Sequence, residues 1–137
     1  MTYDGFDLTG KVAVITGGNG GIGLGFARAL AAAGADVSVW GTNQDKNAAA
    51  EKELQAINSS ASAVRCDVAN EQEVEECMAS VIERYGRIDA CFPNAGIGAQ
   101  NQKPFFEHSN EDWFSVLDVN LNGVFYTLRA ATRQMVA

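Results

Sequence analysis

The sequence predicts an α/β protein in which a doubly wound parallel sheet lies between two layers of helices. The first observation is that short apolar runs alternate four times with longer segments that carry apolar residues at helical spacing. The second is a glycine-rich stretch, Thr16 to Gly23, where the first apolar run passes into the first helical segment. Strands joined through helices run parallel, with right-handed crossovers. These patterns together predict three layers, α/β/α.

The four expected strands are short runs of mostly apolar residues bounded by polar or turn residues. They cover Lys11–Thr16, Ala35–Trp40, Ala61–Cys66 and Ile88–Pro93. Such runs are typical of parallel strands that are buried on both faces.

The four expected helices follow these strands. They cover Leu24–Ala33, Gln44–Ile57, the segment from Asn70 to Gly86 and a long last segment capped by Ser109. Gly34 and Gly86 are expected to end their helices, and Asn70 with Glu73 three residues later resembles a capping box. A loop of small and polar residues, Asn94–Lys103, precedes the last helix.

The composition indicates a folded domain and excludes several classes of partner. A chain of 137 residues has the size of one domain, and 47% apolar with 20% charged residues fits a globular core rather than a disordered chain. The formal net charge of −7 argues against nucleic acid or an anionic membrane as partner, because phosphate groups attract basic patches. No apolar run is long enough to cross a bilayer.

The cysteines do not predict a metal site. Cys66, Cys77 and Cys91 are scattered without a CxxC pair, and His108 lies far from them in the sequence. Because zinc sites use about four nitrogen or sulfur ligands, no metal is expected. The thiols are typical of a cytoplasmic protein with reduced cysteines. Residues Met1–Asp4 lack the basic and then apolar pattern of a signal peptide.

The glycine-rich stretch predicts a phosphate-binding loop. It stands between a strand and a helix, and a helix N-terminus presents unpaired N–H groups and the positive end of a dipole. Glycine lets the backbone turn sharply and approach a phosphate without an intervening Cβ. This context distinguishes a phosphate-binding loop from a merely flexible one.

The carboxyl ends of all four expected strands meet at one rim of the sheet, and each carries small or polar residues. After the glycine loop these are Gly41-Thr42-Asn43, Asp67-Val68 and Asn94-Ala95-Gly96. A dinucleotide across this rim would place its pyrophosphate at the glycine loop and a ribose at the second strand end. Each group alone could be a turn. Because such groups follow all four expected strands, the sequence predicts a dinucleotide-binding domain of the Rossmann type over residues 1–137.

From Leu8 onward, these motifs resemble those of the short-chain dehydrogenases/reductases. Gly17, Gly21 and Gly23 match the glycines of that family's TGxxxGhG loop, in which h is apolar. The same run also satisfies the weaker, general GxGxxG pattern. Asp67, followed by Val68, is similar to the family's Asp-Val after the third strand, where the Asp contacts adenine.

Two further motifs extend the resemblance. Asn94-Ala95-Gly96 is similar to the family's NAG motif, although Pro93 stands where the family usually has Asn. Asn120 resembles the Asn of the fourth helix, which bends that helix and holds a water that relays protons to the active-site lysine. The resemblance therefore implies a catalytic role for Asn120. It also implies cofactor contacts at Gly17, Asn19, Gly20, Gly21, Ile22, Gly23, Gly41, Thr42, Asn43, Cys66, Asp67, Val68, Asn94, Ala95, Gly96 and Val119.

The resemblance implies hydride transfer between a nicotinamide cofactor and a small carbonyl or alcohol substrate. In the family a tyrosine moves the proton, a lysine four residues later lowers the tyrosine pKa, and a serine holds the substrate oxygen. None of Tyr3, Tyr85 and Tyr126 is followed by such a lysine. We therefore expect these groups, and the rest of the sheet, beyond Ala137, and no turnover by the 137-residue chain alone. The alternative is a dinucleotide-binding module or a catalytically dead, truncated relative.

The choice between NAD and NADP depends on the end of the second strand. An acidic residue there binds the ribose hydroxyls and repels a 2′-phosphate, but the chain has Gly41. The positions where a basic residue would favour NADP hold Thr42 and, in the glycine loop, Asn19 and Gly20. Lys46 could reach a phosphate or be solvated. The charge count favours NAD by a small margin and leaves NADP open.

The last helix carries an apolar stripe that the chain itself is not expected to cover. The stripe contains Trp113, Leu117, Leu121 and Leu128. In complete members of the family this helix packs against its mate in a second subunit. We therefore expect a homo-oligomer, either a dimer or a tetramer, and aggregation of a chain that lacks its remaining half.

Overall fold

The computed structural model describes residues 6–98 and 103–137. Residues 1–5 and part of the loop predicted at Asn94–Lys103 lie outside the described residues. In chain order the elements are β1 (Val12–Thr16), α1 (Gly21–Ala32), β2 (Asp36–Gly41), α2 (Gln44–Gln55), β3 (Ser62–Arg65), α3 (Glu71–Tyr85), β4 (Ala90–Pro93), the 3-10 turn η2 (Phe105–Glu107), α4 (Asn110–Leu117), the π-helical turn η3 (Asp118–Asn122) and α5 (Gly123–Met135).

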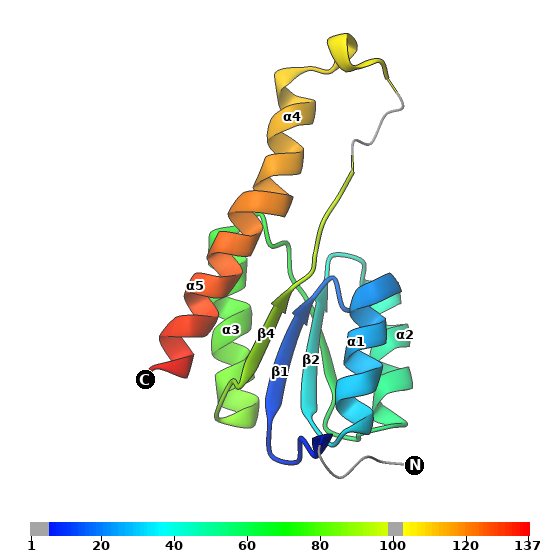
Figure 1. The fold of residues 1–137 in the computed structure, drawn as a ribbon, viewed down its shortest axis with the longest axis vertical. Helices are drawn as coiled ribbons and strands as arrows, with labels where there is room; N and C mark the ends of the chain where they lie inside the picture. The colour runs from blue at the N-terminus through cyan, green and yellow to red at the C-terminus, as the bar shows by residue number, and fades with distance from the viewer. Residues whose placement is uncertain (1–5, 99–102) are drawn as a thin grey trace.

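The four strands form one parallel sheet in the order β3-β2-β1-β4 (Figure 1). From β1 the chain winds outward through β2 to β3, and it then crosses back to place β4 on the other side of β1. Thr16, the last residue of β1, is in register with Trp40 of β2 and with Pro93 of β4. The strand order therefore reverses between β1 and β4, and in open α/β sheets ligands bind at the carboxyl ends of the strands beside such a reversal.

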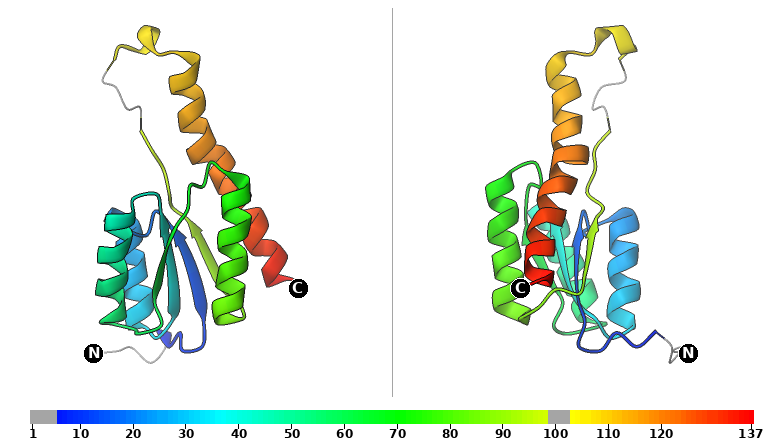
Figure 2. Two further views of the ribbon diagram at one scale, coloured as in Figure 1. Left: turned by 180° about the vertical axis from the view of Figure 1, so that it is seen from behind. Right: turned by 60° about the vertical axis from the view of Figure 1, so that its left-hand side comes forward.

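Helices cover both faces of the sheet, as Figure 2 shows from two sides. The side chains of β1 alternate between two apolar cores. Val12 and Val14 belong to a core that includes buried residues of α3 and α5, whereas Ala13 and Ile15 belong to a core with residues of α1 and α2. This two-residue alternation is the geometry of a strand buried on both faces. The predicted three-layer, doubly wound fold is confirmed.

Some element boundaries differ from the predicted ones for local reasons. The first helix begins at Gly21 rather than Leu24, because the last glycines of the loop already have helical hydrogen bonds, such as Leu24 N–H to Gly20 O. The fourth strand begins at Ala90 rather than Ile88. Asp89 accepts from the Val12 N–H at 2.9 Å through its carboxylate, and this contact precedes the regular ladder.

The predicted capping box of α3 is only half formed. Asn70 accepts from the N–H groups of Gln72 and Glu73, as a cap does. The Glu73 carboxylate, however, accepts from the backbone N–H of Asp67 at 2.9 Å and pairs with Arg65. Glu73 thus fastens the end of β3 to α3 and fixes the position of Asp67.

The last helix is interrupted in a way that the apolar spacing did not predict. A π-helical turn, η3, separates α4 from α5. The N-terminus of α4 has the full capping box, in which Ser109 accepts from the Asp112 N–H and Asp112 accepts from the Ser109 N–H. Figure 1 shows α4 rising beyond the sheet, while α5 lies beside β4 and α3. Within the described residues, no helix is long and apolar enough to cross a membrane.

Candidate cofactor-binding site

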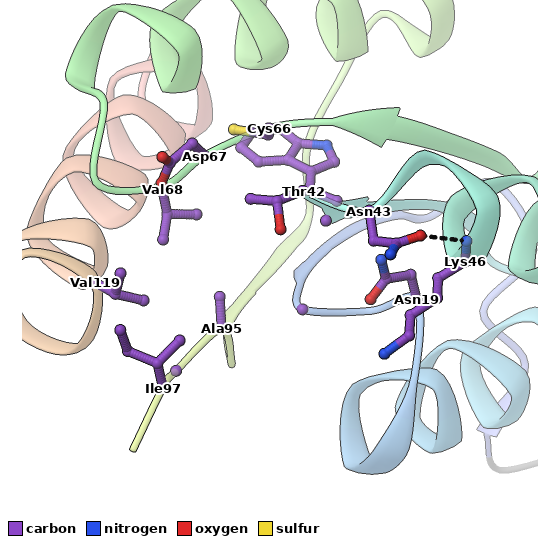
Figure 3. Close-up of a pocket in the computed structure, with 14 residues that line it drawn as sticks. Asn19, Thr42, Asn43, Lys46, Cys66, Asp67, Val68, Ala95, Ile97 and Val119 are labelled. Atoms are coloured by element: carbon purple, nitrogen blue, oxygen red, sulfur yellow. Dashed lines mark hydrogen bonds between the residues drawn. The ribbon is translucent and has the colours of Figure 1, made fainter. Parts of the chain in front are cut away.

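A pocket of about 210 Å³ opens at the carboxyl ends of the strands (Figure 3). All four strand ends contribute to it. It is lined by Gly17, Asn19, Trp40, Gly41, Thr42, Asn43, Lys46, Cys66, Asp67, Val68, Ala95, Gly96, Ile97 and Val119. Figure 3 shows Val68, Val119 and Ile97 on one side of the pocket, and Asn19, Asn43 and Lys46 on the other.

The glycine loop is held tightly against the segment that follows β4. Gly17 has a φ of +64°, a conformation that side chains rarely adopt, and a Cβ on it would lie 2.9 Å from Ala95 Cα. A Cβ on Gly23 would lie 2.4 Å from Gly17 O. Close packing of α1 against the loop therefore requires glycine at both positions, which are two of the glycines that the motif singled out.

The N-terminus of α1 provides backbone donors at the rim. Its N-cap is Gly20, which has no side chain to accept from these N–H groups, and the first turn carries no acidic residue. Unpaired N–H groups and the helix dipole favour an anion there. The geometry agrees with a pyrophosphate beside this helix.

At the end of β2, side-chain amides replace the acidic residue that NAD sites often carry. Asn19 Nδ2 donates to Asn47 Oδ1 at 2.8 Å, and Asn47 Nδ2 donates to Gly41 O at 2.9 Å. A Cβ on Gly41 would lie 2.1 Å from Asn19 Nδ2. The Asn19 amide thus occupies the space in which a side chain at position 41 would begin.

The end of β3 is tied to the same corner. Cys66 N–H donates to Gly41 O at 3.2 Å, and Asp67 Oδ1 accepts from the Ala69 N–H at 3.0 Å. The hydrogen bond between Cys66 and Cys77, together with burial, raises the pKa of the Cys66 thiol, so Cys66 lines the pocket as a neutral group. Asp67 supplies a carboxylate at the rim.

The end of β4 is fastened to β1 and to the glycine loop. Asn94 Nδ2 donates to Thr16 O at 3.1 Å and to Gly17 O at 3.3 Å, and Ala95 N–H donates to Thr16 Oγ1 at 3.0 Å. The side chain of Asn94 thus supports the loop from behind, and the small residues Ala95 and Gly96 face the pocket.

Asn120 lies in η3 and reaches across to the same segment. Its Oδ1 accepts from the Ile97 N–H at 2.8 Å and its Nδ2 donates to Ile97 O at 2.9 Å. The neighbouring Val119 lines the pocket. The helix is therefore irregular at Asn120, the residue for which the family resemblance implied a bend, and the Asn120 side chain holds the pocket wall formed by Ile97.

Most of the predicted cofactor residues line the pocket, but several do not. Gly20, Gly21, Ile22 and Gly23 lie at the start of α1 outside its lining, and Ile22 is 74% exposed. Asn94 does not line the pocket either, because its side chain is directed to Thr16 O and Gly17 O. Three lining residues were missing from the predicted set, namely Trp40, Lys46 and Ile97. The positions of Trp40 at a strand end and Lys46 one turn into a helix were available as signals, whereas nothing local distinguishes Ile97. Within the described ranges, no three His, Cys, Asp or Glu residues gather as metal ligands.

These features define a dinucleotide-binding α/β domain: a glycine loop between β1 and α1, a strand-order reversal beside it, and small or polar residues at the remaining strand ends. Residues 11–137 match the family model described as short chain dehydrogenase. The chain belongs to this family.

Named relatives agree with this assignment. The chain is 34% identical over 129 residues to a 3-oxoacyl-[acyl-carrier-protein] reductase of Chlamydia pneumoniae, covering 94% of this chain and 51% of the relative. It is 36% identical to a probable NADP-dependent mannitol dehydrogenase of Yarrowia lipolytica, covering 92% and 45%. The chain therefore spans about half the length of these curated relatives.

Solved structures show the same half-length match. A short-chain type dehydrogenase/reductase from Mycobacterium marinum superposes with a TM-score of 0.90 at 36% identity, covering 96% of this chain and 52% of that one. An NAD⁺-bound xylitol dehydrogenase superposes with a TM-score of 0.88 at 33% identity, covering 94% and 49%. The relatives thus include proteins named for either cofactor.

Proposed function

We propose that this chain is the cofactor-binding half of an oxidoreductase that transfers hydride between a nicotinamide dinucleotide and a small carbonyl or alcohol. The observation that carries the proposal is the pocket in which the glycine loop faces Gly41, Asp67 and Ala95 across the reversal of strand order. The bound nicotinamide would supply the hydride chemistry, and the protein would supply binding, orientation and proton transfer.

The residues of the pocket fit the parts of a dinucleotide by their chemistry. The N–H groups at the start of α1 suit the pyrophosphate. The carboxylate of Asp67 suits the adenine amino group, which is a donor, and the amides near Gly41 suit a ribose. Ala95 and Gly96 would let the second ribose approach the backbone. The segment that Asn120 holds would then form the nicotinamide end of the pocket.

For the cofactor we propose NAD rather than NADP. The only ammonium at the pocket among the described lining residues is that of Lys46, which is exposed and therefore well solvated. Asn19, Thr42 and Asn43 can hydrogen-bond a ribose without any charge. A purified protein that binds NADPH ten times more tightly than NADH would contradict this choice.

The groups that would carry out proton transfer are proposed to lie outside this chain. The relatives are about twice as long as the chain. Asn120 would serve the reaction by ordering the pocket wall and a proton path, and the 137 residues alone would not turn over. The alternative remains a dinucleotide-binding module without catalysis. A Ser followed by Tyr-x-x-x-Lys in the adjoining coding sequence supports the enzyme, whereas an altered Tyr supports the module.

Exposed apolar side chains and free thiols bear on the assembly and the location of the protein. The exposed apolar side chains of η3 and α5, among them Leu121 and Phe125, favour a homo-oligomer of two or four copies. The free thiols of Cys66, Cys77 and Cys91 fit a reducing compartment such as the cytoplasm.

The test is a titration of the full-length protein with NADH and NADPH, followed by the fluorescence of the reduced nicotinamide. We expect saturable binding to the unmodified protein and none to Gly17→Val, because a side chain there meets Ala95 and a positive φ. Gly98→Ala is the matched control, since a Cβ at position 98 meets nothing within 4 Å. Equal binding by Gly17→Val and the unmodified protein would contradict the proposed site.

A further inference from the structure

Asn47 is a buried polar residue of α2 that no sequence motif singled out. Its exposed fraction is 6%, and its side chain joins two parts of the pocket, the glycine loop and the end of β2. A buried amide that uses both of its polar ends in this way is constrained in orientation, because reversing it would bring like groups together.

The carbonyl oxygen of Gly41 fixes the orientation of both side-chain amides, Asn47 and Asn19. Gly41 O can only accept, so Asn47 must turn Nδ2 toward it and Oδ1 toward Asn19. Because Asn47 Oδ1 can also only accept, Asn19 must in turn present Nδ2 to it. The remaining polar atom, Asn19 Oδ1, is then an acceptor with a fixed direction. Figure 3 shows the oxygen of Asn19 turned to the pocket side and its nitrogen toward the loop of Asn43.

Asn19 also stands where an acidic side chain at position 41 would begin, since a Cβ on Gly41 would lie 2.1 Å from Asn19 Nδ2. An acidic residue at that position selects NAD by accepting from ribose hydroxyls and repelling a 2′-phosphate. The Oδ1 atom of the same amide, which is turned to the pocket side in Figure 3, can accept from a hydroxyl as well. It disfavours a phosphate, which presents only acceptor oxygens.

We propose that Asn47 is a positioning residue for cofactor choice: it holds Asn19 so that Asn19 Oδ1 faces the 2′-position of the adenosine ribose and selects a hydroxyl over a phosphate. The inference rests on the proposed nicotinamide cofactor. It identifies a neutral substitute for the acidic residue that is missing at Gly41. The two side chains are expected to act in opposite directions. Asn47, through Asn19, favours a 2′-hydroxyl, whereas the ammonium of Lys46 would attract a 2′-phosphate.

The experiment compares the dissociation constants of NADH and NADPH in the full-length protein and in Asn47→Ala. Without Asn47, Asn19 can reverse its amide and donate Nδ2 to a phosphate. We expect the ratio of the two constants to move toward NADPH by about tenfold, which corresponds to roughly 1.4 kcal/mol.

Asn58→Ala is the matched control. Asn58 Nδ2 donates to Ala35 O at 2.8 Å, so this amide supports the opposite end of β2 as Asn47 supports Gly41 O. Its loss should lower the melting temperature and leave the NADH/NADPH ratio unchanged. If Asn47→Ala does not fold, Asn19→Ala provides the second variant. It should weaken NADH binding about tenfold and NADPH binding less, because it removes the Oδ1 acceptor that suits a ribose hydroxyl and does not suit a phosphate.

Cofactor binding and the positioning role of Asn47 can fail separately. If the unmodified protein binds neither NADH nor NADPH, both fail. If it binds them and Asn47→Ala shifts their ratio no more than Asn58→Ala does, the positioning role of Asn47 is wrong while the proposed function stands. A preference for NADPH in the unmodified protein that is lost in Lys46→Ala would also overturn the inference.

Discussion

Asn120 is hydrogen-bonded to both backbone polar groups of Ile97: the Ile97 N–H donates to Oδ1 at 2.8 Å, and Nδ2 donates to the Ile97 carbonyl at 2.9 Å. The Asn120 side chain thus pairs with both backbone groups of one residue after β4, as the backbone of a neighbouring strand would. The π-helical turn at Asp118–Asn122 lies at this contact, and such turns occur often at functional sites. The contact joins the last helix to the wall of the pocket.

Replacing Asn120 with Ala should release this wall. Two hydrogen bonds are lost, each with a net value of about 1 kcal/mol, so we expect NADH affinity to fall by up to about thirtyfold. The measurement is a fluorescence titration of the full-length protein. Asn122→Ala is the control, because the Asn122 side chain donates to Asp118 Oδ1 on its own helix, away from Ile97. Equal affinities of the two variants would show that the Asn120–Ile97 contact does not order the pocket.

The fold could be predicted from the sequence because its causes are local and periodic. Apolar residues at a spacing of two place Val12 and Val14 on one face of the sheet, and a helical spacing defines one side of each helix. Parallel topology follows from the alternation of the elements alone. The positions of Asp67 and Asn94 at one rim then follow from the topology without any knowledge of their contacts.

The parts that could not be predicted depend on contacts between distant segments. Asn47 reads in the sequence as one polar residue among others on α2, and only its pairing with Asn19, 28 residues earlier, makes it part of the site. The apolar spacing continues through the η3 turn, so only the family resemblance at Asn120 indicated an irregularity in this helix. Glu73 was expected to cap its own helix, but it pairs with Asp67 and Arg65 instead.

The two glycines Gly23 and Gly25 lie in the same helix and predict opposite responses to alanine. A Cβ at position 23 would lie 2.4 Å from Gly17 O, which is backbone and cannot move aside cheaply. We expect Gly23→Ala to lower the free energy of unfolding by about 1–3 kcal/mol. A Cβ at position 25 meets nothing within 4 Å, so Gly25→Ala should raise stability by roughly 0.5–1 kcal/mol.

Urea denaturation of the full-length protein measures both changes. If Gly23→Ala is as stable as Gly25→Ala, the loop and the helix are not packed as closely as the structure indicates. NADH affinity should also fall in Gly23→Ala, because a shift of Gly17 moves the phosphate-binding loop.

Asp89 predicts a specific dependence of stability on pH. The Arg87 guanidinium, and then the Val12 N–H, lower the pKa of Asp89 from 3.8 to about 2 in spite of partial burial. Because the folded-state pKa is below the unfolded one, the stabilisation is complete above about pH 4. It is lost as the pH falls from 3.8 toward 2.

Asp89→Asn should therefore lower the free energy of unfolding by roughly 1–2 kcal/mol at pH 7, since the charged acceptor of the Val12 N–H is lost. The difference between the variant and the unmodified protein should shrink as the pH is lowered toward 3. Urea titrations at several pH values measure this difference. A difference that stays constant from pH 7 to pH 3 would show that the charge of Asp89 does not stabilise the start of β1.

The exposed apolar residues of the last helix predict an interface. Leu121 and Phe125 are 61% and 55% exposed, and they stand four residues apart across η3 and α5, so they share one side of the helix. Leu121→Lys combined with Phe125→Lys should place two ammonium groups in the contact and shift the full-length protein to monomers. Sedimentation or size-exclusion chromatography with light scattering measures the mass.

Ile57→Lys is the control, because Ile57 is 44% exposed near the end of α2, far from this helix in the chain. If the double variant keeps the mass of the unmodified oligomer, subunits associate through another surface, and the exposure of Leu121 and Phe125 has a different cause.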